Sequence, residues 1–168
     1  MEAVVAVAPD RACTALRLAH GFDHGYRRRA SIQGSSSFSR MKLTLQLSCY
    51  NGARYLPHLF ASLNAQTFQD WRLVVLDNAS HEADAQAIRE AMRVLPRERA
   101  EWFRVHPNIG FAGAHSYLFD RRDRQSEYVA LLNDDAILEP TYLETLVREL
   151  DTHAECGAVE GIIYRWNR

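Results

Sequence analysis

Two adjacent aspartates stand where the chain could bind a metal ion. Asp134 and Asp135 follow Asn133, which comes directly after the apolar run of residues 128–132. Neighbouring carboxylates at the end of a buried strand repel each other and lose hydration, and a divalent cation such as Mg²⁺ or Mn²⁺ offsets both costs. Such a cation can bridge the oxygens of a diphosphate and neutralise the negative charge of the diphosphate as this group leaves. The pair alone leaves a second interpretation open, in which the two aspartates cap a following helix.

A second polar pair, Asp77 and Asn78, follows the continuous apolar run of residues 73–76. The asparagine amide can both donate and accept, so it could read the edge of a pyrimidine base, and the aspartate could accept a base N–H. The alternative is an Asx turn that leads into a helix capped by Ser80. One residue can serve both roles.

A glycine-containing segment, HPNIGFAGAH, occupies residues 106–115. Gly110 and Gly113 would let a ligand approach the backbone closely, and the helix that follows would present its N-terminus to phosphate. Phe111 fits a core position as well as a ligand contact. His115 could touch phosphate, although an exposed position on a helix is the commoner case for such a histidine.

Alternating strand and helix patterns separate these polar segments. The predicted strands are residues 42–48, 72–76, 102–105, 128–132 and 158–164. The predicted helices carry three apolar stripes, which are Leu56, Leu59, Phe60 and Leu63; Ile88, Ala91, Met92 and Leu95; and Leu143, Leu146, Val147 and Leu150. This alternation predicts an α/β fold with a mostly parallel sheet and helices on both faces. Ligands bind such sheets at the carboxyl ends of the strands, so the polar segments should meet at one edge.

Composition sets the wider limits. The chain has 168 residues, is 47% hydrophobic and carries a net charge of −1. It is long enough for one core, and its charge gives no reason to expect nucleic acid as a partner. No apolar run approaches the roughly 20 residues of a membrane span. Three widely spaced cysteines, Cys13, Cys49 and Cys156, predict neither a disulfide framework nor a zinc ribbon and favour a reducing cytoplasm.

The first forty residues differ from the rest. Residues 27–29 are all arginine and residues 35–37 are all serine, neither of which is a packing pattern. The apolar stretch at residues 1–9 is short, and Glu2 stands where an export signal would carry positive charge. We therefore expect a flexible segment over residues 1–40 and a folded domain over residues 41–168.

Four segments, taken in order, resemble the N-terminal half of family 2 glycosyltransferases with the GT-A fold, and rhamnosyltransferase-like members above all. The segments are LSCYNGARYLPHLFASLNAQTF, WRLVVLDNAS, NIGFAGA and LLNDDAILEP. The resemblance implies a Rossmann-like nucleotide-diphospho-sugar transferase fold. It assigns the binding of a nucleotide sugar to Ser48, Tyr50, Asn51, Asp77, Asn78, Asn108, Gly110, Phe111, Gly113, Asn133 and Asp134. It places the DxD metal motif on residues 133–135, with Asp135 as the residue that binds Mg²⁺ or Mn²⁺. After NIGFAG, members of the family often have Gly and then Asn, whereas this chain has Ala114 and His115. This difference alters the expected sugar contacts at that end of the segment.

By the same resemblance, the reaction is an inverting transfer of a sugar from a UDP- or dTDP-sugar to a hydroxyl of a glycan or lipid-linked acceptor in polysaccharide biosynthesis. The catalytic base is unknown and is expected beyond Arg168, so the domain is expected to be truncated to its donor-binding half. The alternative is a catalytically incomplete fragment that binds nucleotide sugar without transferring it. With no covering element, Ile162, Ile163 and Tyr164 should be partly exposed and favour a homodimer. The expected location is the cytoplasm, including the inner face of the membrane.

Overall fold

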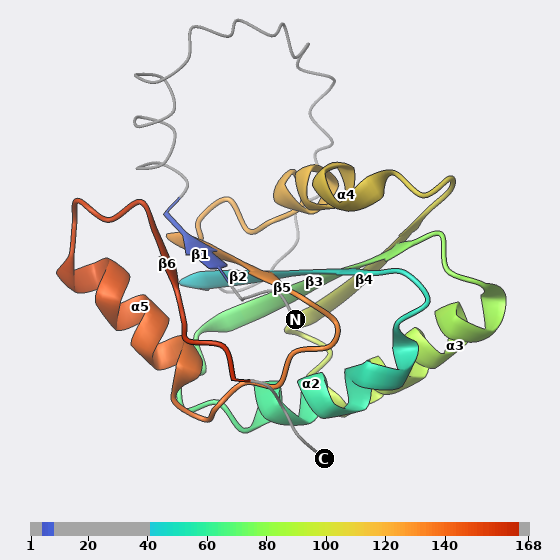
Figure 1. Cartoon of the computed structure of the whole chain (residues 1–168), viewed down its shortest axis with the longest axis horizontal. Helices are drawn as coiled ribbons and strands as arrows, with labels where there is room; N and C mark the ends of the chain where they lie inside the picture. Colours follow the sequence, from blue (N-terminus) through green and yellow to red (C-terminus); the bar gives the residue numbers. More distant parts are fainter. Residues whose placement is uncertain (1–4, 9–40, 165–168) are drawn as a thin grey trace, which may run out of the picture.

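The computed structural model describes residues 5–8 and 41–164. Their strands form one sheet in the order β4-β3-β2-β5-β1-β6 (Figure 1). The strands are β1 (Val5–Val7), β2 (Leu43–Cys49), β3 (Trp71–Asn78), β4 (Ala100–Val105), β5 (Tyr128–Leu132) and β6 (Ala158–Glu160). Strands β2 to β5 run parallel, whereas β1 is antiparallel to both of its neighbours. The mostly parallel sheet predicted from the sequence is confirmed.

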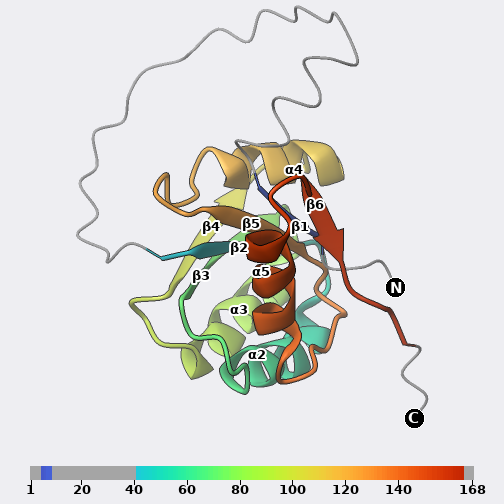
Figure 2. The same ribbon diagram turned by 90° about the vertical axis from the view of Figure 1, so that its left-hand side faces the viewer.

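Helices cover both faces of this sheet, as predicted. They are α2 (Leu56–Asn64), α3 (Glu82–Ala91), α4 (Gly110–Phe119) and α5 (Tyr142–Thr152), with short 3₁₀ turns η1 (Ala53–Tyr55) and η2 (Met92–Val94). Figure 2 shows α2, α3 and α5 on one side of the sheet and α4 on the other. No helix among the described residues is long and apolar enough to cross a membrane.

The period-two alternation of strand side chains divides the core into two layers. On β3, Leu73 and Val75 belong to the large cluster beneath the sheet, which also contains the apolar stripes of α2 and α5. Val74 and Leu76 point the other way and pack against Ala114 and Leu118 of α4. All eight residues of β3 are buried, as expected for a strand covered on both faces.

The N-terminal segment departs from expectation. Residues 5–7, expected to be flexible, form β1 and pair with both β5 and β6. Ala6 and Ala8 are 0% and 3% exposed. The small side chains of this short apolar stretch are therefore buried where β1 joins the sheet. The rest of the expected flexible segment, residues 1–4 and 9–40, lies outside the described residues.

The last strand also differs from its prediction. It covers Ala158–Glu160 rather than residues 158–164, and its partner is the antiparallel β1. Pairing stops at Gly161, whose N–H donates to the Tyr142 hydroxyl at 3.1 Å and whose Cα lies against the Tyr142 ring. Beyond it, Ile162 and Tyr164 are 78% and 75% exposed, which confirms the exposure predicted for this segment.

Candidate functional site

An open cleft of about 520 Å³ lies at the carboxyl ends of the parallel strands, beside the start of α4. Its lining residues are Ser48, Tyr50, Asn78, Asn108, Phe111, Asn133, Asp134 and Asp135. All eight are among the residues predicted to form the site, and they come from the four polar segments that follow the predicted parallel strands, residues 48–52, 77–80, 106–115 and 133–136. The prediction that these segments meet at one edge of the sheet is confirmed. The ligand-binding roles of the individual residues stay predictions.

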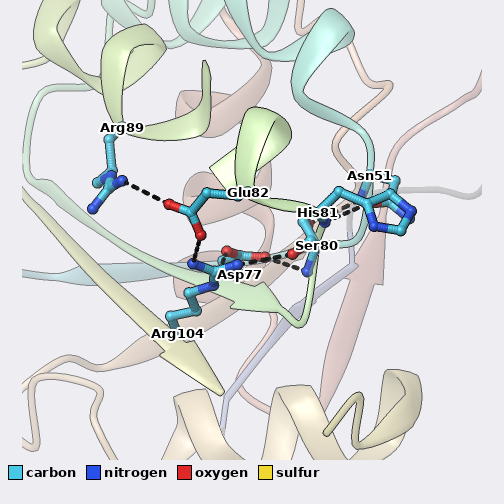
Figure 3. A network of polar contacts seen from close by, with 7 residues as sticks. All are labelled: Asn51, Asp77, Ser80, His81, Glu82, Arg89 and Arg104. Carbon is cyan, nitrogen blue, oxygen red and sulfur yellow. Dashed lines mark hydrogen bonds and ion pairs between the residues drawn. The ribbon is translucent and has the colours of Figure 1, made fainter. Parts of the chain in front are cut away.

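Asp77 does not line the cleft. It is fully buried, and its Oδ1 accepts the Ser80 N–H at 2.8 Å (Figure 3). Its Oδ2 lies 3.0 Å from Nε of Arg104, an ion pair that lacks hydrogen-bond geometry. Asp77 therefore bonds the local backbone three residues on, rather than two residues on as in the expected Asx turn. Its carboxylate does not reach the cleft, because alternation along β3 turns Asp77 to the face opposite Asn78.

Arg104, which the sequence analysis missed, joins two strand ends. It lies on β4 directly opposite Asp77 of β3. Its Nη2 donates to the Ser80 carbonyl at 2.9 Å, and its Nη1 lies 2.6 Å from Glu82 on α3. The hydrogen bond from Arg104 lowers the pKa of Glu82, and the same bond raises the pKa of Arg104. In the sequence, only the position of Arg104 along the predicted strand, which sets the face of the sheet to which its side chain points, could have suggested this contact.

Asn51 and Ser80 support the cleft from behind. The Asn51 N–H donates to Ser80 Oγ at 3.0 Å, and Asn51 Oδ1 accepts the His81 N–H at 2.9 Å. Asn51 has a positive φ of 55°, a conformation that asparagine tolerates better than most residues. Ser80 does not cap α3 as predicted, because α3 begins at Glu82 and His81 stands at the N-cap position. Asn51 therefore shapes the turn and is not among the cleft-lining residues.

Asn78 fixes the start of α4. Its Nδ2 donates to Asn108 Oδ1 at 3.1 Å and to the Gly110 carbonyl at 3.2 Å, while its Oδ1 accepts the Ile109 N–H at 2.9 Å. Gly110 has a φ of +73°, which glycine adopts without strain. Gly113 lies inside α4, where an added Cβ would come 3.3 Å from the Ile109 side chain. Both glycines are thus explained by helix geometry, and neither lines the cleft.

Phe111 and His115 lie one turn apart on α4 and have different surroundings. Phe111 lines the cleft with 58% of its surface exposed, so it is not a core residue. His115 is 8% exposed, packs edge-on against Phe111 with ring centroids 4.4 Å apart, and has Nδ1 3.4 Å from Gln46 Oε1. Burial lowers the pKa of His115 to about 4. Both predictions for His115, a phosphate contact and an exposed helix position, are wrong because α4 turns this residue towards β2.

The two aspartates of the predicted metal motif differ in their surroundings. The Cys49 thiol donates to Asp134 Oδ2 at 3.3 Å, and burial raises the pKa of Asp134. Burial also raises the pKa of Cys49. Among the described residues, Asp135 has no hydrogen bond or ion pair. No helix follows the pair directly, since α5 begins at Tyr142, so the helix-cap interpretation is wrong.

The donor set fits a divalent cation that binds together with a phosphate ligand. Within residues 5–8 and 41–164, no group of three or more His, Cys, Asp or Glu side chains could hold a metal ion. Of the carboxylates in the described part of the chain, the cleft offers those of Asp134 and Asp135. Mg²⁺ is commonly held in this way, by one or two carboxylates and by the phosphates of the substrate.

The sequence profile of glycosyl transferase family 2 matches residues 45–168. The chain belongs to this family. A curated relative, an uncharacterized glycosyltransferase of Nostoc sp., is 28% identical over 125 residues, which cover 71% of this chain and 36% of that protein.

Solved structures share the fold of this family member. S. aureus TarS is 21% identical with a TM-score of 0.58, over 68% of this chain and 20% of that one. The mannosyltransferase PcManGT from Pyrobaculum calidifontis, in complex with GDP-Man and Mn²⁺, is 18% identical with a TM-score of 0.57, over 84% of this chain and 39% of that one. The chain spans well under half the length of each of these relatives.

Proposed function

We propose that this chain binds the donor substrate of a glycosyltransferase, a nucleoside-diphosphate sugar, for inverting transfer of the sugar to a hydroxyl acceptor. The observation that carries the proposal is the convergence of four strand ends on one cleft lined by amides, carboxylates and exposed aromatic rings. Membership of glycosyl transferase family 2 supports the same reaction. A structure of an S. aureus TarS fragment in complex with UDP-GlcNAc, with a TM-score of 0.58 to this chain, supports this class of donor.

The aromatic residues are suited to the flat parts of the donor. Tyr50 and Phe111 line the cleft and are 54% and 58% exposed, so a bound base or sugar ring would cover apolar surface that is now in contact with water. The amides of Asn78, Asn108 and Asn133 also line the cleft. Those of Asn108 and Asn133 can donate to polar groups of the ligand, whereas both N–H groups of the Asn78 amide already donate within the protein. We assign UDP- or dTDP-sugars as donors.

We assign the cation site to Asp135, whose carboxylate has no competing partner among the described residues. A bound Mg²⁺ or Mn²⁺ would supply a positive charge that neutralises the leaving diphosphate. The two remaining roles of the protein are to hold the diphosphate beside Asp135 and to keep the base and sugar against the cleft walls. The Mn²⁺ in the complex of the structurally similar PcManGT supports a cation in this fold.

A second candidate function is donor binding without transfer. Inversion requires a base within hydrogen-bond reach of the attacking hydroxyl. In the described part of the chain, the carboxylates that line the cleft are Asp134 and Asp135, both of which belong to the proposed metal motif. This favours a chain that binds nucleotide sugar while the base and the acceptor site lie elsewhere.

One experiment separates the candidates. Calorimetry with UDP, dTDP and GDP, with and without Mn²⁺, should show Mn²⁺-dependent binding of a uridine or thymidine diphosphate. Incubation with the matching nucleotide sugar and a glycan or lipid-linked acceptor then reports transfer. Binding without transfer supports the second candidate, and transfer supports the first. Absence of nucleotide binding under every condition contradicts both.

Two further assignments rest on exposed and free side chains. The exposure of Ile162, Ile163 and Tyr164 supports a homodimer, which sedimentation at several concentrations would detect. We also propose the cytoplasm, including the inner face of the membrane, as the location, and the free thiols of Cys49 and Cys156 agree with a reducing compartment.

A further inference from the structure

We propose that Cys49 and Gly52 are positioning residues that hold the Asp134 carboxylate against the end of β2 and leave Asp135 as the metal-binding carboxylate. This inference rests on the proposed function, because it concerns how the proposed metal motif is oriented. It gives the two adjacent aspartates different roles: Asp134 anchors the turn, and Asp135 meets the ligand.

The first support is the contact itself. Cys49 Sγ lies 3.3 Å from Asp134 Oδ2 and is the donor, since the carboxylate can only accept when ionised. Cys49 is fully buried, so the thiol has no solvent to donate to instead. Its hydrogen bond occupies an oxygen of Asp134, whereas Asp135 has no such partner among the described residues.

The second support is the missing side chain at residue 52. A Cβ built on Gly52 would overlap Asp134 Oδ2 and would lie 3.3 Å from Cys49 Sγ. Gly52 has a φ of −108°, which any residue can adopt, so the turn conformation does not require glycine. Space for the carboxylate of Asp134 therefore explains glycine at this position.

The third support is the strand register. β2 and β5 are parallel neighbours, and the last pair in their register is Leu47 with Leu132. Cys49 and Asp134 each lie two residues further along, so the parallel pairing brings them to the same level. The packed apolar faces of both strands fix this register, and a slip of one residue would turn every side chain to the other face.

The contact can be tested without any ligand, through the infrared S–H stretching band of Cys49. A Cys13→Ser, Cys156→Ser background leaves Cys49 as the one thiol. The band should lie at the low frequency of a thiol that donates to a carboxylate, and it should move to higher frequency in Asp134→Ala and in Gly52→Ala. A band at the same frequency in all three proteins would overturn the inference.

The positioning role is tested by Mn²⁺-dependent binding of UDP, measured by calorimetry. Loss of a residue that orients a metal ligand costs about ten- to hundredfold in affinity, which is the loss expected for Cys49→Ala. Cys49→Ser keeps a donor at the same place and should recover most of it. Cys156→Ser, which changes a partly buried thiol distant in sequence from the cleft-lining residues, is the matched control and should bind like the wild type.

Gly52→Ala provides a second variant because the atom that it displaces is the end of a flexible side chain. Its melting temperature should stay near that of the wild type while Mn²⁺-dependent UDP affinity falls as in Cys49→Ala. Unchanged affinity in both Cys49→Ala and Gly52→Ala would overturn the positioning role. If the wild type binds no nucleotide, the proposed function fails, and the S–H band with the binding of Mn²⁺ alone still decides this inference.

Discussion

Acidification should destabilise this protein through His115, which is the buried histidine among the described residues. His115 is 8% exposed beneath α4, and burial lowers its pKa to about 4 from its usual value of 6.5. Between these pH values the unfolded chain binds a proton at His115 that the folded chain does not. The stability that the neutral ring contributes is therefore complete above about pH 6.5 and is lost as the pH falls to about 4.

The size of the effect follows from the two pKa values. They differ by about 2.5, and each pKa unit corresponds to about 1.4 kcal/mol, so the full loss is at most about 3.5 kcal/mol. The Phe111 ring that covers His115 is itself exposed to the cleft, so His115 is not fully shielded from water. We therefore expect a loss of stability of about 2 kcal/mol in practice. That is a large share of the stability of a domain of this size.

The assay is urea unfolding, followed by tryptophan fluorescence, at about pH 7 and about pH 4.5. Carboxylates also titrate in this range, so the informative quantity is the difference between the wild type and His115→Asn, which cannot bind a proton. The wild type should lose about 2 kcal/mol more than this variant. His153→Asn, which removes a half-exposed histidine on the surface, is the matched control and should follow the wild type. Equal losses in wild type and His115→Asn would refute a buried neutral imidazole.

Three further predictions concern the cleft and the sheet. Asp135→Ala should lower Mn²⁺-dependent UDP affinity by more than about tenfold with an unchanged melting temperature. The control is Glu98→Gln, which changes an exposed carboxylate near the amino end of β4 and should bind normally. Equal calorimetric affinity in the two variants would count against the metal role. Arg104→Met should lower the melting temperature by roughly 5–10 °C, because it leaves the buried Asp77 charge unpaired, whereas Arg93→Met, which breaks an exposed pair, should change it little. Ala6→Asp places a charge at a fully buried position and should destabilise the fold by about 3 kcal/mol in urea unfolding, and no change would show that β1 is not part of the stable sheet.

The sequence by itself determined the elements and the edge at which they form a site. Apolar stripes such as Leu56, Leu59, Phe60 and Leu63 are spaced for one face of a helix, and all four are buried in α2. Continuous apolar runs marked the central parallel strands, and polar residues followed each run. Parallel strands bring their carboxyl ends to one edge, so the convergence of Ser48, Asn78 and Asn133 follows from local patterns alone.

Tertiary structure decided which residue of the Asp77 and Asn78 pair reaches the cleft. Asp77 and Asn78 are adjacent, yet one lies buried beside Arg104 and the other lines the cleft, because successive strand residues point to opposite faces. The sequence shows the alternation, but which face of the sheet carries the cleft depends on where the helices pack. Asp134 meets Cys49 across 85 positions of the chain, and β1 inserts between β5 and β6. Such contacts depend on strand order and register, which arise when distant segments pack together and therefore leave no local pattern to read.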